Sequence, residues 1–98
     1  MFCVYILFSE TIQEYYCGQT SNLSQRLVQH NAGETSSNKR GIPWNLVGYL
    51  ELETRAESMM LERKIKKRGI KRWLQIHQEK LKNLGHGVAE INHAVPRD

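Results

Sequence analysis

The sequence predicts a single α+β domain in which a three-stranded antiparallel sheet is flanked by helices. Three segments, 3–8, 14–17 and 44–52, have the aromatic and β-branched composition of strands. Two segments that begin near positions 22 and 54 have the capping residues and apolar spacing of helices. The chain has 98 residues, of which 40% are hydrophobic and 24% charged, so it can build one small core.

The first two strands are expected to form a hairpin. Residues 3–8 are continuously apolar, which is typical of a strand that is buried on both faces. Residues 9–13 are polar and residues 14–17 return as the second strand, so antiparallel pairing is the simplest arrangement. Tyr15 and Tyr16 point to opposite faces because side chains alternate along a strand. The pattern alone leaves open which of the two faces a functional site.

A short helix is expected to follow the hairpin. Residues 20–22 suit an N-cap, and Leu23 and Leu27 supply an apolar stripe. Arg26 and His30 are four residues apart, so they share a helix face away from that stripe. We expect both side chains to reach one pocket together with an aromatic hydroxyl of the hairpin. Taken alone, the pair also fits a solvated arginine and a packed histidine.

A longer helix is expected to begin after Thr54, because Thr54 and Glu57 have the spacing of a capping box. Its apolar side chains form two patches at helical spacing, Ala56, Met59 and Met60 in one and Leu61 and Ile65 in the other. Glu62 falls between the two patches, at the edge of the core. A carboxylate there needs a partner, which is either a divalent cation or Lys66 at i+4. The sequence leaves both partners open.

Cations are concentrated in one part of the chain. Residues 63–72 contain seven of the 14 lysines and arginines and no acidic residue, although the net charge is only +4. A phosphate backbone is the commonest partner of such a segment. The alternative is that these cations lie on an ordinary solvent-exposed helix and bind no partner. A polar loop, residues 34–43, adds Lys39 and Arg40 before the third strand.

The expected domain covers residues 1–80, and residues 81–98 form a loosely ordered C-terminal extension. Gly69 should interrupt the helical region, with a second helix continuing to about Leu84. No segment has the ~18 apolar residues of a membrane helix, so we expect a cytoplasmic protein with no membrane partner. Cys3 and Cys17 are expected to be free thiols rather than a disulfide.

Ordered groups of residues along segment 2–78 resemble the GIY-YIG nuclease superfamily, and most closely its small stand-alone bacterial members with a URI-type endonuclease domain. Each group is weak alone, and the ordered set is specific. The matching groups are Val4-Tyr5-Ile6-Leu7, Tyr16-Cys17-Gly18-Gln19-Thr20, Leu23, Arg26-Leu27, His30-Asn31, Gly33, Pro43-Trp44-Asn45-Leu46-Val47, Ala56-Glu57 and Leu61-Glu62-Arg63-Lys64-Ile65-Lys66-Lys67.

The resemblance implies a role for each residue of one site. Tyr5 and Tyr16 would flank the attacking water, and Arg26 would stabilise charge on the scissile phosphate. His30 would help to move a proton. Glu62 would be the sole protein ligand of one divalent metal ion, Mg²⁺ or Mn²⁺. Tyr15 would then be the packing tyrosine.

The chain departs from the family pattern in three places. Cys3 stands for the glycine of the first motif and Cys17 for the isoleucine of the second. Many family nucleases also have an asparagine about a dozen residues after the glutamate, where this chain has residues 71–74 without an asparagine.

The sequence therefore predicts a metal-dependent endonuclease that hydrolyses phosphodiester bonds of DNA through water activated by a tyrosine. The cations expected to bind nucleic acid are Lys39, Arg40, Arg63, Lys66, Lys67 and Lys71. The alternative is a catalytically silent nucleic-acid-binding module of the same fold, which would bind in a salt-sensitive way without cleaving. A third hypothesis is a catalytic cassette that a protein partner recruits, because 98 residues leave no room for a separate DNA-reading domain.

Overall fold

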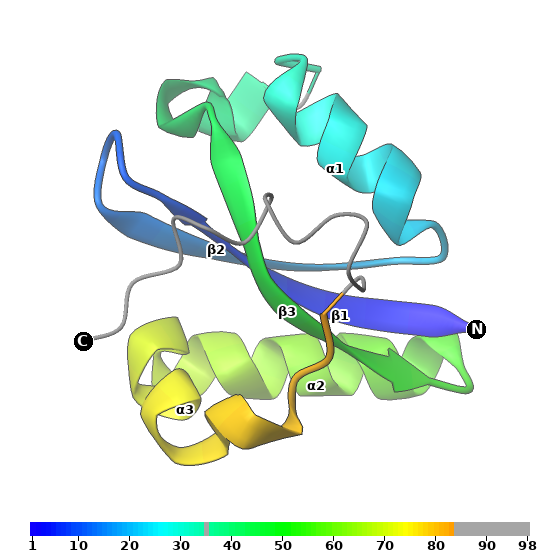
Figure 1. The fold of residues 1–98 in the computed structure, drawn as a ribbon. Helices are drawn as coiled ribbons and strands as arrows, with labels where there is room; N and C mark the ends of the chain where they lie inside the picture. The colour runs from blue at the N-terminus through cyan, green and yellow to red at the C-terminus, as the bar shows by residue number, and fades with distance from the viewer. Residues whose placement is uncertain (35, 84–98) are drawn as a thin grey trace.

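The computed structural model describes residues 1–34 and 36–83 and confirms the α+β prediction. Three antiparallel strands lie in the order β2-β1-β3 (Figure 1). Helix α1 covers one face of the sheet, and α2 and α3 cover the other (Figure 1). The elements are β1 Phe2–Ser9, β2 Glu14–Thr20, α1 Leu23–Asn31, η1 Ser36–Gly41, β3 Trp44–Leu52, α2 Arg55–Arg68, α3 Ile70–His77 and η2 Gln78–Lys80.

Strand β1 is the central strand and supplies side chains to two separate cores. Tyr5 and Leu7 pack under α1, whereas Val4 and Ile6 pack under α2 and α3. All four are at most 1% exposed, which explains why the sequence of this strand is apolar without alternation. Strand β3 runs from Trp44, as predicted, and pairs with β1 along its length.

Side chains cap the two main helices at the predicted positions. Asn22 accepts a hydrogen bond from the Gln25 amide at 3.1 Å and caps α1. Thr54 and Glu57 form the complete capping box at the start of α2. Such caps satisfy amides that would otherwise lack partners at a helix start, which is why they are readable from sequence.

Only one of the two apolar patches predicted on α2 packs into the core. Ile65 is fully buried with Leu61 packed against the same core, whereas Met59 and Met60 of the other patch are 44% and 66% exposed. The fully buried residues of α2 are Ser58 and Ile65. The Ser58 hydroxyl donates to the Arg55 carbonyl at 2.7 Å. A small serine with an internal partner can thus occupy an inner position that hydropathy assigns to the surface.

Helix α3 ends at His77, and the prediction of a helix to about residue 84 is wrong. After η2 the backbone becomes extended at Leu81, and Lys82 pairs with Tyr49 of β3. The Tyr49 amide donates to the Lys82 carbonyl at 3.0 Å, and the Lys82 amide donates back at 2.8 Å. Pairing with an exposed sheet edge therefore replaces the last helical turns. The remainder of the predicted extension, from residue 84, lies outside the described residues.

Cys3 and Cys17 are free thiols, as predicted, because they belong to different cores on opposite faces of the sheet. Burial raises the pKa of the Cys17 thiol to about 12, so it stays protonated. Within residues 1–34 and 36–83, no helix has the length and apolar character needed to span a bilayer.

Candidate functional site

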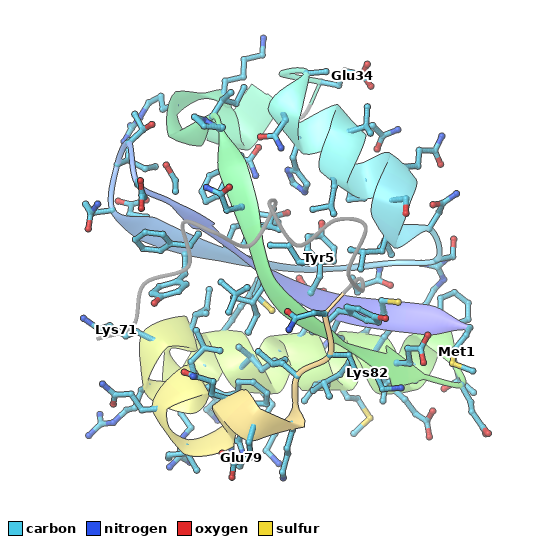
Figure 2. All side chains as sticks on the ribbon, in the orientation of Figure 1. Met1, Tyr5, Glu34, Lys71, Glu79 and Lys82 are labelled. Carbon is cyan, nitrogen blue, oxygen red and sulfur yellow. The ribbon has the colours of Figure 1, made fainter. Side chains whose placement is uncertain are left out.

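Three of the predicted site residues form one cluster between the sheet and α1. The Tyr5 hydroxyl lies 2.9 Å from Nε2 of His30, within hydrogen-bond distance. The rings of Tyr16 and His30 are 5.0 Å apart and those of Tyr5 and Tyr16 are 6.2 Å apart. Figure 2 shows Tyr5 near the middle of the molecule. Strands β1 and β2 and helix α1 each contribute one of these side chains.

Gly18 provides the space in which the Tyr5 ring lies. Gly18 is directly opposite Tyr5 in the β1–β2 register. A Cβ atom at position 18 would lie 2.5 Å from the Tyr5 hydroxyl oxygen and 2.8 Å from the ring carbon that carries it. Because glycine has no side chain, the phenol can cross β2 and approach Tyr16 and His30.

Burial keeps the two inner groups of this cluster uncharged. It raises the pKa of Tyr5 far above its ordinary value, and negative charge on Tyr16 would raise it further. Burial also lowers the pKa of His30, the hydrogen bond with Asn38 partly offsets this effect, and the nearby Arg26 cation adds to it. Tyr5 and His30 are therefore a neutral phenol and a neutral imidazole near pH 7.

The prediction that His30 lies away from the buried stripe of α1 is wrong. His30 is fully buried and lies on the same inner face as Leu23 and Leu27. Its two ring nitrogens have protein partners, Tyr5 at Nε2 and Asn38 at Nδ1, which makes the burial of a polar ring tolerable. Arg26 is half-buried, and its charge acts on both Tyr5 and His30.

Glu62 comes from the other face of the sheet and reaches the cluster through Lys66. The Glu62 carboxylate accepts a hydrogen bond from the Lys66 ammonium at 2.6 Å, so the i+4 ion pair left open by the sequence is formed. The Lys66 nitrogen lies 6.0 Å from the centre of the Tyr16 ring. The Glu62 side chain is 21% exposed, which makes it accessible to a small ion.

Strand β2 explains how residues from two faces can meet. It is an edge strand that, in the part of the chain the structure describes, pairs only with β1. Tyr16 and Cys17 are consecutive on it, and Tyr16 faces α1 while Cys17 lies in the core under α2. Glu62 and Lys66 both act electrostatically on Cys17. The candidate site therefore wraps around the open edge of the sheet.

The sequence matches a known family of catalytic domains. A profile of the GIY-YIG catalytic domain matches residues 1–73 of the chain. The chain belongs to the GIY-YIG family. It is also similar to the solution NMR structure of the UPF0213 protein BH0048 from Bacillus halodurans, with 27% sequence identity and a TM-score of 0.51 over 82% of this chain and 86% of that chain. No curated protein sequence matches the chain significantly. The resemblance seen in the sequence is thereby confirmed.

The carboxylate of this GIY-YIG domain fits a weak, largely hydrated metal site. Within the described residues there is no group of three or more His, Cys, Asp and Glu side chains that could hold a metal ion. Glu62 is partly exposed and negatively charged, and Mg²⁺ commonly keeps several waters while binding one or two carboxylates. Lys66 already neutralises Glu62, so a metal ion would have to displace or share with that lysine.

A cavity of about 310 Å³ adjoins the cluster at the hairpin end of the sheet. Its lining includes Tyr16 and Trp44 together with Asn38 and Arg40 of η1. Neither Arg26 nor Glu62 lines it. Tyr16 is therefore the cluster phenol that lines a cavity, whereas Tyr5 is only 1% exposed.

The cations predicted to bind nucleic acid lie on three different elements. All six are exposed, Lys39 and Arg40 on η1, Arg63, Lys66 and Lys67 on α2, and Lys71 on α3. Lys66 faces the site, and Lys71 lies at the periphery of the domain (Figure 2). Lys64 and Arg68 instead act on His77 of α3. The basic run is continuous in sequence, but a helix distributes consecutive residues around its axis. Its cations therefore do not all lie on one side of the helices.

Asn38 is the site residue that the sequence analysis missed. It is 8% exposed, and its amide nitrogen lies 3.1 Å from Nδ1 of His30. It stands in a polar loop eight residues after His30, where nothing in composition or spacing sets it apart from its neighbours. Lys66 was expected to bind nucleic acid, and its position between Glu62 and Tyr16 was not foreseen.

Proposed function

We propose that this GIY-YIG domain is a metal-dependent endonuclease that hydrolyses phosphodiester bonds of DNA. The observation that carries the proposal is the gathering of Tyr5, Tyr16 and His30 in one cluster, with Glu62 next to it through Lys66. Family membership supports a nuclease, and the exposed cations of η1 and α2 support a polyanionic substrate.

In this proposal Tyr16 is the phenol that contacts the attacking water. Tyr16 is half-buried and lines the cavity, whereas Tyr5 is buried and its raised pKa keeps it protonated. Tyr5 and His30 lie within hydrogen-bond distance of each other, and both rings contact the Tyr16 ring. Tyr16 would act in its phenolate form, after its own proton has passed to solvent. The Tyr16 oxygen would take a proton from the attacking water as the new bond to phosphorus forms and the bond to the leaving oxygen breaks, and the leaving oxygen would take a proton from solvent.

Arg26 and a metal ion on Glu62 would stabilise the negative charge that develops on the phosphate oxygens. Hydrolysis of a phosphodiester builds negative charge on the oxygens around phosphorus, and a positioned guanidinium stabilises that charge. Arg26 is half-buried beside the cluster, where its field is screened less than at the surface. A Mg²⁺ or Mn²⁺ ion held by Glu62 would supply Lewis-acid stabilisation of the phosphate and leaving group.

A silent binding module of the same fold is the second candidate. The observation that favours it is the 2.6 Å ion pair, because Lys66 already satisfies the only carboxylate assigned to the metal ion. This candidate predicts DNA binding that weakens with salt and no cleavage with either metal ion.

The decisive experiment compares Glu62→Gln with the parent on single-stranded, duplex and branched DNA, with and without Mn²⁺ or Mg²⁺. We expect the substitution to abolish nicking, because glutamine is a poor metal ligand, and to change DNA affinity by less than about twofold. Glu79→Gln, on η2 at the periphery of the domain, is the matched control (Figure 2). Equal cutting by Glu62→Gln and the parent would refute the role of Glu62. Salt-sensitive binding by a parent that cuts none of the three substrates would favour the silent module.

A further inference from the structure

Asn38 is held by a closed set of hydrogen bonds between η1, β3 and α1. Trp44 donates from its indole nitrogen to the Asn38 carbonyl at 2.8 Å. The Trp44 backbone is bound in turn by the Asn31 side chain, which accepts from the amide at 2.6 Å and donates to the carbonyl at 3.0 Å. Asn31 immediately follows His30 in α1. The circuit therefore fixes Asn38 relative to the imidazole.

Gly41 allows the tryptophan to close this circuit. A Cβ atom at position 41 would overlap the six-membered part of the Trp44 indole. Trp44 can therefore lie flat against the η1 backbone, where its N–H reaches the Asn38 carbonyl. The irregular conformation of Asn38 inside η1, with φ −134° and ψ 31°, directs its side chain into the core rather than into solvent.

We propose that Asn38 is a positioning residue that fixes the tautomer of His30. The Asn38 amide nitrogen, which can only donate, lies 3.1 Å from Nδ1 of His30. Nδ1 must then be the acceptor, and the single proton of the neutral imidazole is on Nε2. That nitrogen lies 2.9 Å from the Tyr5 hydroxyl, so His30 donates to the Tyr5 oxygen.

The tautomer sets the direction of the whole chain of hydrogen bonds. Tyr5 accepts from His30 and keeps its own proton, which is then available to the neighbouring Tyr16, and the interaction with Tyr16 contributes to the raised pKa of Tyr5. Every donor from Asn38 onward then points towards the Tyr16 oxygen. Such a chain stabilises negative charge on that oxygen. The inference rests on the proposed function, in which Tyr16 receives the proton of the attacking water.

The other tautomer would reverse the chain. With the proton on Nδ1, Nε2 would accept from Tyr5, and Tyr5 could no longer donate to Tyr16. Among the described residues for which a contact with His30 is known, the titratable and charged groups are Tyr5 from β1, Tyr16 from β2 and Arg26 from α1. None of these three is a carboxylate that would hold a proton on Nδ1, whereas the Asn38 amide nitrogen at Nδ1 favours the Nε2-protonated state.

The first test is the tautomer itself, measured without substrate. Long-range ¹H–¹⁵N NMR spectra of the ¹⁵N-labelled full chain, at a pH where His30 is neutral, distinguish a protonated Nε2 from a protonated Nδ1. We expect the Nε2-protonated form in the parent. A parent with the proton on Nδ1 overturns the proposal, whether or not the protein cuts DNA.

The second test replaces the amide by a carboxylate of the same shape. Asn38→Asp places an acceptor opposite Nδ1, so we expect His30 to change to the Nδ1-protonated tautomer and its measured pKa to rise. Nicking should fall by about 10²-fold, the lower range for a lost proton-transfer arrangement, with DNA affinity within about threefold of the parent. Asn45→Asp is the control, because it adds the same charge on β3, where side-chain alternation turns it to the face opposite Trp44.

The outcomes separate the inference from the proposed function. An unchanged tautomer in a folded Asn38→Asp protein overturns the inference. The expected change of tautomer in Asn38→Asp but not in Asn45→Asp supports it. Absence of nicking by the parent, with the expected tautomers, would refute the nuclease proposal and leave the assignment of the Asn38 contact supported.

Discussion

Substitution of Gly18 by alanine tests whether the site depends on the close approach of Tyr5 to β2. The new Cβ atom would lie 2.5 Å from the Tyr5 hydroxyl oxygen and 3.1 Å from a ring carbon of Tyr16. Real Cβ contacts are longer, so the Tyr5 ring has to move. Tyr5 is 1% exposed and is packed on all sides, which leaves its ring no vacant space to enter.

Overpacking of this kind costs about 1–3 kcal/mol of the free energy of unfolding. A domain of this size loses about 4–8 °C in Tm for each kcal/mol. Gly48→Ala is the matched control, because a Cβ there would lie 2.7 Å from Cβ of Leu81, also inside the sheet. Leu81 belongs to the core on the α2 and α3 face, away from His30. Both variants should therefore lose similar stability, and only Gly18→Ala should disturb the cluster.

Thermal unfolding followed by circular dichroism gives the loss of stability, and the NMR resonances of the His30 ring report its contact with Tyr5. We expect both variants to unfold at a lower temperature and only Gly18→Ala to shift the His30 resonances and to lose nicking activity below Tm. A Gly18→Ala protein with the parent's Tm and unchanged His30 resonances would refute the packing argument. Equal shifts in both variants would show that the effect is not local.

Two further predictions concern charge at the site. The folded pKa of His30 lies below its ordinary 6.5, so its neutral form contributes stability that is complete above about pH 6.5 and is lost as the pH falls towards the folded pKa. Urea midpoints from about pH 7.5 to 5 should fall less steeply for His30→Gln than for the parent, and equal slopes would contradict the burial argument. Lys66→Met should tighten Mn²⁺ binding to the free protein about two- to fivefold, because an ion pair that is half exposed contributes up to about 1 kcal/mol. Lys67→Met removes the same charge from an exposed position and should change it less, and equal gains would contradict direct competition for Glu62.

Much of the fold could be predicted because it depends on contacts between neighbours in the chain. The capping box of Thr54 and Glu57, the hairpin and the extent of β3 from Trp44 all follow from local chemistry and were predicted correctly. The end of α3 was predicted incorrectly because pairing of Lys82 with β3 competes with the helix. No residue near position 77 is a helix-ending signal from which this competition could be predicted.

Which apolar face of α2 is exposed also could not be predicted from the local sequence. A helical wheel that contains Met59, Met60 and Ile65 offers two apolar faces, and only the position of the sheet decides which one is buried. The same is true of His30, whose spacing with Arg26 placed it on an outer face. Its burial requires a hydroxyl from β1 and an amide from η1, and these lie 25 and 8 residues away in the chain.

The sequence by itself determined the family, the three strands, the helix starts and the residue types of the site, because each is encoded in a short segment. The tertiary structure decided how those residues are related in space. It made Tyr5 a buried phenol and Tyr16 the phenol at the cavity, it paired Glu62 with Lys66, and it brought Asn38 to the imidazole. These relations arise where separate segments pack together around an edge strand, and no local pattern specifies how such packing aligns them.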